Sequence, residues 1–395
     1  PEEAFIRCYA ALIDAATQGG VPTTIVASIT SDKDRRLLNQ VYFSSGSPEN
    51  IEIVAQFQDG NGKRAAIAEG LRVVARDLPP ARSVTVLMDG DTILSQDAIA
   101  KSIVFFQADP DLAAATTNNR ALVQGTYTTK NWYAVRMAQR HTLMASMALS
   151  HRLLVLTGRY SLFRTDIAVS ADFIAQVEHD TIAHWHLGDI TLLTGDDKST
   201  WFNVLKRGGK MLYIPDVVSY SVEALPSPGR FFPASTRLMR RWFGNMLRAN
   251  SRSVALGPRK TGALIWWSLV DQKLSVWTSL VGPIAVVFLA TFLSPIFIVY
   301  YLAWALFVRT VLSIGAALNH GTISASWPFL MYYNQVWGAA LKSWLIFHLD
   351  RQSWTRQDIT GAAPKSIMAN TNSTLLHILS LLLLTACVGV FIGQI

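Results

Sequence analysis

The 395-residue chain is 50% hydrophobic but only 16% charged, whereas soluble domains average about 25% charged residues. This composition excludes a purely soluble protein and indicates that part of the chain lies in a membrane. The formal net charge of +8 favours anionic lipid over nucleic acid, because the excess Lys and Arg lies beside apolar segments. Cys8 and Cys387 are too few and too far apart to predict a disulfide framework or a metal site.

The first part of the chain, residues 1–235, is predicted to be an α/β sheet domain. It opens at Pro1 with an expected amphipathic helix and no signal peptide, and we expect the natural chain to begin earlier. Short β-branched runs then alternate with helical stretches, which is the pattern of a sheet covered by helices. The clearest runs are Thr23–Ile29, Asn50–Val54 and Ser83–Met88.

Asp89-Gly90-Asp91 follows the third of these runs. Two carboxylates at the end of a strand can hold a hard divalent cation, Mg²⁺ or Mn²⁺, which neutralises a diphosphate leaving group. The alternative is a plain turn, because Asp and Gly are common turn residues. The place at a strand end and the motifs that follow favour metal binding by Asp89 and Asp91.

Gly195-Asp196-Asp197 lies later in the same domain, just before an expected helix. An acceptor hydroxyl becomes a good nucleophile only when a base takes its proton, and Asp197 is the predicted base. The alternative is an N-cap pair that stabilises the helix by about 1 kcal/mol. The two roles are compatible, with one Asp capping the helix and the other acting as the base.

A basic amphipathic helix is predicted between Arg237 and Arg248. Its apolar residues recur at four-residue spacing, so one stripe faces lipid or core and the arginines share the opposite side. The stripe comprises Leu238, Met239, Trp242, Phe243, Met246 and Leu247, and the opposite side comprises Arg237, Arg240, Arg241 and Arg248. One interpretation is a plain interfacial helix. The other makes Arg241 a phosphate clamp and Trp242 a flat wall for a sugar ring.

Three later segments are apolar enough and long enough to cross a bilayer: Trp277–Leu293, Ile296–Leu318 and Leu375–Ile392. The aromatic stretch Trp327–Leu349 is predicted to lie in the membrane plane, with a fourth crossing as the alternative. These features divide the chain into five parts. They are the sheet domain at 1–235, interfacial amphipathic helices at 236–275, a transmembrane hairpin at 276–318, an interfacial helix with a gating loop at 319–373, and a C-terminal transmembrane helix at 374–395.

Flanking charges agree with a cytoplasmic sheet domain. Basic residues precede the hairpin and follow the interfacial stretch, whereas Arg309 is nearly alone inside the hairpin. The hairpin then returns the chain to the side of the Asp motifs, which places Asp350–Arg356 on that side as well.

Taken together, the motifs resemble those of the processive family 2 glycosyltransferases, the group that contains cellulose, chitin and hyaluronan synthases. Asp89-Gly90-Asp91, Gly195-Asp196-Asp197 and Arg241-Trp242 are similar to the family's D-x-D, T-E-D or G-D-D, and Q-x-x-R-W signatures. Leu238 departs from the pattern, because many relatives have Gln there. Further stretches resemble the alginate-producing branch of the family, and the resemblance covers nearly the whole chain. They are Ala138–His141, Ser146–Ser150, Thr157–Arg159, Thr194–Ser199, Arg241–Asn245, Tyr333–Gln335 and Gln352–Gln357.

The resemblance implies a Rossmann-like GT-A domain on the cytoplasmic side of a bacterial inner membrane, followed by interfacial and transmembrane helices. The family's first strand and N-terminal membrane helices would lie before Pro1. A hexosyltransferase of this branch would polymerise GDP-mannuronate into β-1,4-polymannuronate by an inverting displacement and extrude it through its own channel. The alternatives are a related synthase of a neutral β-glucan from UDP-glucose and a non-catalytic scaffold, which the intact motifs argue against.

The resemblance also implies roles for individual residues. Asp89 and Asp91 would hold the nucleotide and the metal, and Asp197 would be the base. Lys63 and Arg64 would touch the nucleotide, or else form a solvated turn. The positions expected to contact the acceptor or the diphosphate are Gly158, Arg159, Arg241, Trp242, Trp354, Thr355 and Arg356.

The implied partners are a nucleotide-sugar donor, a growing polysaccharide acceptor, membrane lipid and a membrane co-polymerase subunit that binds cyclic-di-GMP, with no nucleic acid. A polyuronate carries a carboxylate on every unit, so the channel mouth should be basic. Arg240, Arg248, Arg309 and His320 are candidates for that mouth, although each also fits a flanking or packing role.

Overall fold

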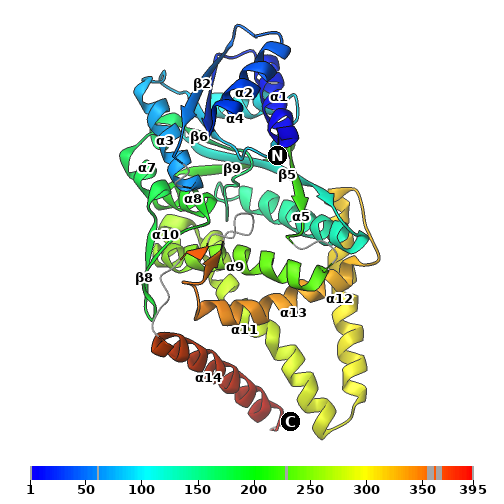
Figure 1. The fold of residues 1–395 in the computed structure, drawn as a ribbon. Helices are drawn as coiled ribbons and strands as arrows, with labels where there is room; N and C mark the ends of the chain where they lie inside the picture. The colour runs from blue at the N-terminus through cyan, green and yellow to red at the C-terminus, as the bar shows by residue number, and fades with distance from the viewer. Residues whose placement is uncertain (1, 60–61, 227–229, 354–359, 362–366, 394–395) are drawn as a thin grey trace.

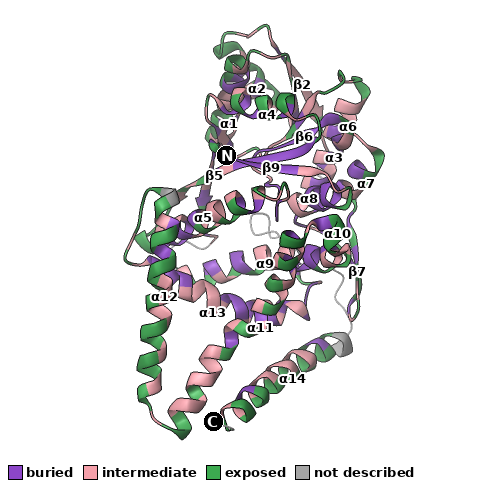
Figure 2. Ribbon diagram, turned by 180° about the vertical axis from the view of Figure 1, so that it is seen from behind, coloured by how far each residue is buried: buried purple, intermediate pink, exposed green. Residues whose placement is uncertain are grey.

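The structure is a computed structural model that describes residues 2–59, 62–226, 230–353, 360–361 and 367–393. Figure 1 shows an α/β domain at one end and three long helices projecting from the other, with α9 and α13 crossing between them. In Figure 2 the buried residues concentrate in the sheet and its helices, whereas the long helices are largely exposed. The molecule therefore has the two regions expected from its composition.

The N-terminal part of the α/β domain alternates helices and strands. The elements are α1 (Glu2–Gly19), β1 (Thr23–Ile29), α2 (Asp32–Ser44), β2 (Ile51–Phe57) and α3 (Lys63–Arg76). β1 and β2 pair in parallel, with Thr23 opposite Ile51 and Ile29 opposite Phe57. Ser31 and Asp34 form a capping box that starts α2. The opening helix and the first two strands agree with the sequence pattern.

A five-stranded mixed sheet forms the centre of the domain, in the order β3-β6-β5-β9-β4. Its long parallel pair is β5 and β9, and β6 runs antiparallel to both β3 and β5. The elements of this part are β3 (Val84–Leu87), β4 (Thr92–Leu94), α4 (Ala98–Ala108), β5 (Leu112–Gln124), α5 (Tyr127–Ala148), β6 (Ser161–Arg164), α6 (Thr165–Ala168), α7 (Ala171–Glu178), β7 (Thr181–His184), β8 (Gly188–Thr191), α8 (Asp196–Lys206) and β9 (Lys210–Ala224).

A cavity of about 1460 Å³ lies between β1 and β3. Within the described residues, β1 pairs only with β2 and β3 only with β6, so one edge of each strand faces this space. Helices α1, α3 and α4 also contribute to its walls, and its inner end reaches Asp89, Asp91, Asp196 and Asp197. The cavity thus connects the gap in the sheet with both Asp motifs.

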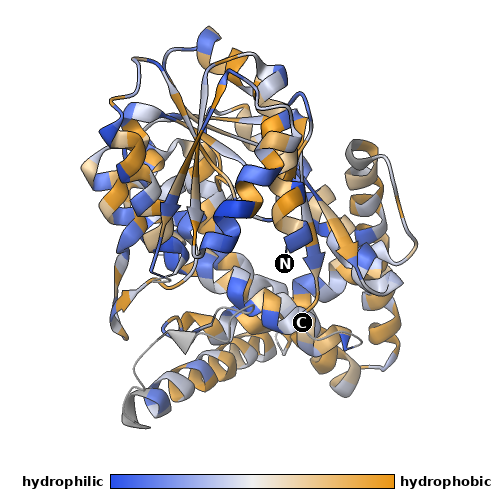
Figure 3. Cartoon of the chain, turned by 45° about the horizontal axis from the view of Figure 1, so that its top comes forward, coloured by the Kyte–Doolittle hydropathy of each residue, from blue (hydrophilic) through white to orange (hydrophobic). Residues whose placement is uncertain are grey.

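Six helices follow the sheet domain: α9 (Phe231–Ala255), α10 (Gly257–Thr261), α11 (Ala263–Phe292), α12 (Ile296–His320), α13 (Trp327–Ile346) and α14 (Ile367–Ile392). Among the described residues, three helices are long and apolar enough to cross a membrane, at Ala263–Phe292, Ile296–Leu318 and Asn370–Ile392. Figure 3 shows hydrophobic colour dominating the helices near the marked C-terminus. The three expected crossings therefore coincide with α11, α12 and α14.

The first of these helices starts earlier than expected. α11 is continuous from Ala263, so the expected boundary between residues 275 and 276 falls inside one helix. Ile265 and Leu269 at its start are buried in the core of the sheet domain. The helix therefore links that core directly to the apolar region. The remaining described strands, β10 (Gln352–Ser353) and β11 (Thr360–Gly361), form a short antiparallel pair.

α13 packs along α9 and is not one of the candidate spans. Trp337 Nε1 donates to Thr236 Oγ1 at 2.9 Å, and the hydroxyls of Ser235 and Tyr333 lie 2.9 Å apart. Leu238 and Met239 of α9 are buried in one cluster with Trp327 and other α13 residues. The apolar stripe of α9 therefore faces protein. Arg248, expected on the side of α9 opposite the stripe, is only 2% exposed and is therefore also packed inside the protein.

Candidate active site

Lys63 joins the two Asp motifs. Its Nζ lies 2.5 Å from Asp89 Oδ1 and 2.7 Å from Asp196 Oδ2. Lys63 is the first residue of α3, Asp89 follows β3, and Asp196 is the first residue of α8. Motifs that are far apart in the sequence thus meet around one ammonium group at the inner end of the cavity. This contact places the predicted metal and base motifs in a single site.

Gly158 allows this close approach. Its carbonyl accepts a hydrogen bond from the Asp89 amide at 2.9 Å. A Cβ at this position would lie 3.3 Å from Asp89 Oδ2 and 3.4 Å from Lys63 Nζ. A side chain here would therefore press on both members of the ion pair, so glycine fits this position for steric reasons.

The surroundings of Asp196 and Asp197 shift the pKa values of these two side chains in opposite directions. Burial raises the pKa of Asp197, and the neighbouring charge of Asp196 raises it further. Burial would also raise the pKa of Asp196, but the Lys63 ammonium, the charge of Arg64 and a backbone hydrogen bond together outweigh burial, and the pKa of Asp196 is lowered. Asp196 is thus held as a carboxylate, while Asp197 has the greater affinity for a proton. This is the electrostatic setting in which a carboxylate acts as a general base.

Neither Asp196 nor Asp197 is the N-cap residue of α8, so the capping alternative for them is wrong. Gly195 is the N-cap residue, with a φ of +86° that favours glycine. Asp196 and Asp197 are the first two residues of α8, where negative charge suits the helix dipole. The two carboxylates therefore support the helix start without capping it and remain part of the cavity wall.

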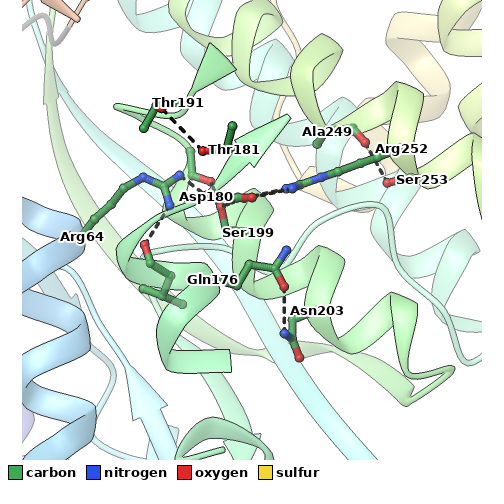
Figure 4. A network of polar contacts seen from close by, with 12 residues as sticks. Arg64, Gln176, Asp180, Thr181, Thr191, Ser199, Asn203, Ala249, Arg252 and Ser253 are labelled. Atoms are coloured by element: carbon green, nitrogen blue, oxygen red, sulfur yellow. Dashed lines mark hydrogen bonds and ion pairs between the residues drawn. The ribbon is translucent and has the colours of Figure 1, made fainter. Parts of the chain in front are cut away.

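A buried polar network anchors the loop that carries these two residues (Figure 4). Ser199 Oγ lies 2.5 Å from Asp180 Oδ2, and Asp180 accepts two hydrogen bonds from Arg252 at 2.6 and 2.7 Å. Arg64 approaches from the opposite side and donates to Ser199 Oγ at 3.1 Å and to the Thr194 carbonyl at 3.2 Å. The start of α8 is thus fixed between α3 and α9.

Arg64 consequently differs from its expected role. We expected Lys63 and Arg64 both to touch the nucleotide, but only Lys63 lines the cavity. Arg64 is 7% exposed and points into the network of Figure 4. Successive helical residues point about 100° apart, so neighbouring cations at the start of α3 face different surroundings.

A second set of contacts ties the same loop to the segment after α13. Asn245 Oδ1 accepts from Thr194 Oγ1 at 2.7 Å and from Arg248 Nη2 at 2.6 Å. Arg248 Nη1 donates to the Leu349 carbonyl at 3.0 Å. Gln352 accepts from the Leu193 amide at 3.0 Å. These residues connect the base-bearing loop with the chain that leads to Trp354, Thr355 and Arg356, which lie outside the described residues.

Trp242 lies in an aromatic cluster between α9 and α5. Its ring stacks on Trp132 with centroids 5.6 Å apart and meets Tyr133 edge-on at 6.2 Å. The Arg136 guanidinium lies 4.4 Å from the Trp242 centroid. Arg241 and Trp242 are both half-buried. The structure therefore places Trp242 beside α5, with part of the side chain still accessible.

Arg159 follows Gly158 and forms an ion pair with Glu223 of β9. Glu223 also accepts a hydrogen bond from the Tyr133 hydroxyl at 3.4 Å. Arg159 thus lies between the ion-pair site and the aromatic cluster, as part of a wall shared by α5 and β9.

The residues present fit a divalent cation that shares its coordination with phosphate. Asp89 and Asp91 supply hard oxygen donors on the cavity wall. Among the described residues, no group of three or more His, Cys, Asp or Glu side chains is arranged to hold a metal alone. Mg²⁺ is usually held by one or two carboxylates together with substrate phosphates, and a two-carboxylate motif matches that requirement.

Sequence reasoning missed Asp180, Asn245 and Arg252. Asn245 stands beside the Arg-Trp motif, and its spacing from Arg248 was the available signal, because residues three apart share a helix face. Asp180 and Arg252 meet only through the tertiary fold. No local pattern marks that pair.

Comparisons with known proteins complete the description of the site. The family model described as "Glycosyltransferase like family 2" matches residues 5–245. The chain is 40% identical to Glycosyltransferase alg8 of Pseudomonas syringae pv. tomato over 353 residues, which are 89% of this chain and 71% of that protein. It is 39% identical to Glycosyltransferase alg8 of Azotobacter vinelandii over 353 residues, which are again 89% of this chain and 71% of that protein. A solved mannosyltransferase from Pyrobaculum calidifontis, in complex with GDP-Man and Mn²⁺, is 16% identical with a TM-score of 0.43, covering 81% of this chain and 76% of its own.

Proposed function

This chain belongs to glycosyltransferase family 2 and is a hexosyltransferase, and on that premise we propose that it polymerises GDP-mannuronate into β-1,4-polymannuronate. The observation that carries the proposal is the Lys63 contact with Asp89 and Asp196, which assembles the donor and base motifs into one site. The relatives named Glycosyltransferase alg8 support a role in alginate biosynthesis. The family match also agrees with the mixed α/β sheet, and the expected fold class is confirmed.

Donor binding is assigned to the inner end of the cavity. Asp89 and Asp91 would hold Mg²⁺ or Mn²⁺ there, and the bound cation would offset the negative charge that develops on the diphosphate. Lys63 adds a positive charge beside both carboxylate motifs. As a donor with a negative diphosphate enters, the ammonium group is positioned to contact it as well.

Asp197 is assigned as the general base. It lines the same cavity, and burial together with Asp196 raises its pKa, so it accepts a proton more readily than an ordinary aspartate. The acceptor hydroxyl gives its proton to an Asp197 oxygen while its own oxygen attacks the anomeric carbon. The bond from that carbon to the diphosphate breaks on the opposite face, which inverts the configuration.

The acceptor is assigned to the side of the site nearest Trp242 and Arg241, where the half-buried indole offers an apolar surface to a sugar ring. Gly158 and Arg159 lie between this side and the ion pair. Trp354, Thr355 and Arg356 are assigned to close over the diphosphate. Processive extension and extrusion through the α11, α12 and α14 region belong to the same proposal.

A bacterial inner-membrane location, with the sheet domain in the cytoplasm, fits the three apolar helices and the basic residues beside them. The proposed partners are the nucleotide sugar, the growing polysaccharide, membrane lipid and a membrane co-polymerase subunit that binds cyclic-di-GMP.

The donor is tested directly with isolated membranes. We expect membranes that contain the protein to incorporate label from radiolabelled GDP-mannuronate and not from UDP-glucose. The product should be degraded by alginate lyase and resist glucanase. Membranes that contain the Asp197→Asn variant serve as the control for incorporation of label by other enzymes. Incorporation from UDP-glucose alone, into a glucanase-sensitive product, would replace polymannuronate with a neutral glucan.

A further inference from the structure

Two arginines on α5, Arg136 and Arg140, have no anionic partner among the described residues. They lie four residues apart, so they share one face of the helix one turn apart. Both are half-buried. Neither makes a hydrogen bond or ion pair with a described residue, although Arg136 lies against two indole rings. A desolvated guanidinium without an anion is unfavourable, so this pair is prepared for an anionic ligand.

Arg136 lies at the membrane-side end of this pair. Its guanidinium carbon is 4.4 Å from the Trp242 centroid and 5.1 Å from the Trp132 centroid. Trp132 in turn donates from Nε1 to Asn334 Oδ1 of α13 at 2.8 Å. Arg136 therefore adjoins the indole assigned to the acceptor and the helices that lead to the candidate spans.

Arg140 lies at the catalytic end. Burial lowers the pKa of its guanidinium most, and the nearby charges of Arg159 and Asp197 also act on it, the first lowering and the second raising that pKa. Burial, together with the charge of Arg140, lowers the pKa of Arg136 to about 10. The two cations thus extend from the surroundings of Asp197 toward Trp242.

The other cations considered for an acidic polymer are already engaged. Arg248 donates to the Leu349 carbonyl, and Arg309 donates to Gln335. Arg240 lies over the Trp344 ring, and Arg159 pairs with Glu223. His320 has no described side chain. Arg248 is buried inside the network of α9, which agrees with the packing role that was the alternative for it. Arg136 and Arg140 differ from Arg248, Arg309 and Arg159 in having no anion or acceptor of their own among the described residues. They differ from Arg240 in being half-buried, whereas Arg240 is exposed.

We propose that Arg136 and Arg140 form a carboxylate-binding track that recognises the uronate units at the growing end of the acceptor. The ligand class is a uronate-bearing oligosaccharide, and this inference rests on the proposed function. Each planar guanidinium offers paired N–H donors that match a carboxylate. Successive units would engage Arg140 near the base and then Arg136 beside Trp242, so acidic acceptors are distinguished from neutral ones at this helix.

Binding of two matched probes to the purified full-length chain in detergent tests the track. The probes are a β-1,4-linked mannuronate trimer and its carboxyl-reduced form, the neutral mannose trimer. Arg140→Gln is expected to weaken binding of the acidic trimer by about 10- to 100-fold, as for loss of a charge-assisted bidentate contact, and to leave the neutral trimer unchanged. Arg140→Lys keeps the positive charge but lacks the paired N–H donors, so its affinity for the acidic trimer should fall between those of wild type and Arg140→Gln.

Lys130→Gln is the matched control, because it removes one positive charge from an exposed position on the same helix. It should bind both trimers as wild type does. If Arg140→Gln still prefers the acidic trimer as strongly as wild type does, the track is wrong. If it loses both trimers equally and Arg140→Lys restores neither, Arg140 acts through packing and the track is also wrong. If wild type itself shows no preference for the acidic trimer, the polymannuronate assignment is wrong, and the track that rests on it is wrong as well.

Discussion

At the scale of single residues, Lys63 is the cation that the carboxylates of the two Asp motifs share. It contacts Asp89 and Asp196 directly. Its positive charge also lowers the pKa of Asp197, although burial and Asp196 raise that pKa overall. The ammonium group thus limits how far the predicted base moves toward protonation.

Replacing Lys63 with Met should change the pH dependence of transfer. Without the ammonium charge, the pKa values of both Asp196 and Asp197 rise, because Lys63 lowers both. The base is active only when deprotonated, so activity in Lys63→Met should begin to fall at a higher pH than in wild type as the medium is acidified. The rate at neutral pH should also fall by about tenfold or more, since a charged contact is lost. Initial rates measured across the acidic range provide the check, and an acidic limb that stays in place would contradict this role for Lys63.

Gly158→Ala tests the steric role of glycine beside the ion pair. The added methyl group would lie 3.3 Å from Asp89 Oδ2, so the carboxylate must shift by a few tenths of an ångström. Small displacements of catalytic groups cost up to about 100-fold in rate, and we expect a loss of about tenfold or more with little change in thermal stability. Gly188→Ala is the control for a glycine-to-alanine change away from the ion pair, since nothing lies within 4 Å of the added Cβ. Its φ of +70° adds backbone strain, so its thermal stability is measured as well. A Gly158→Ala enzyme with wild-type kinetics would show that Asp89 tolerates movement.

How far these residues could be predicted differs from one to the next. Asp89, Asp91 and Asp197 were found because acidic pairs next to a strand end or a helix start are visible in sequence. The inward orientation of Arg64 could not be, since it depends on the phase of α3 after its first residue. No role for Arg136 or Arg140 could be predicted, although Arg140 lies in the stretch Ala138–His141, because their lack of an anionic partner is a property of the tertiary structure.

At the scale of elements, α8 and α9 are joined by buried charge. Asp180 is placed just before β7 and bonds both Ser199 of α8 and Arg252 of α9. Its side chain is 4% exposed, and that of Arg252 is 18% exposed. The pair therefore fixes the start of the base-bearing helix relative to the helices that approach the membrane.

Asp180→Ala should lower the thermal midpoint strongly, because it leaves the Arg252 guanidinium in a largely buried region without its carboxylate. Removing one partner of a buried pair costs about 3–5 kcal/mol. Asp172→Ala breaks the more exposed Arg207 pair and should cost about 1 kcal/mol or less. Thermal unfolding of both variants in the same detergent compares them, and equal midpoints would mean that the Asp180 network adds no stability.

The strands show what local patterns can predict. β1 coincides with its expected run and β3 lies within its own, because β-branched residues alternate there. The order of the sheet could not be predicted, since β5 and β9 pair across most of the domain.

At the scale of the whole molecule, the three candidate spans set the topology. If α11, α12 and α14 cross a membrane while α13 lies along α9, the sheet domain and the C-terminus would lie on opposite sides of that membrane. Four crossings, with α13 inserted, would return the C-terminus to the side of the sheet domain. The packing of α13 against α9 favours three.

Reporter fusions at the C-terminus distinguish these topologies. We expect alkaline phosphatase fused there to be active and green fluorescent protein fused there to be dark, since both report a periplasmic position. Fusions after Ser324, in the loop between α12 and α13, should give the opposite pattern. A fluorescent C-terminal fusion would place α13 in the membrane.

Lys63 joins the two Asp motifs into one site by contacting Asp89 and Asp196. A double-mutant cycle on kcat/KM with Asp89→Asn and Asp196→Asn measures this coupling. Because both carboxylates contact the same ammonium group, the double variant should depart from the product of the single losses by more than about 0.5 kcal/mol, or roughly twofold. For the control pair, exposed Asp172→Asn combined with Asp89→Asn, the fold-losses in kcat/KM of the two single variants should multiply to give the loss of the double variant. If the losses from Asp89→Asn and Asp196→Asn also multiply, the motifs act separately and the single-site account is contradicted.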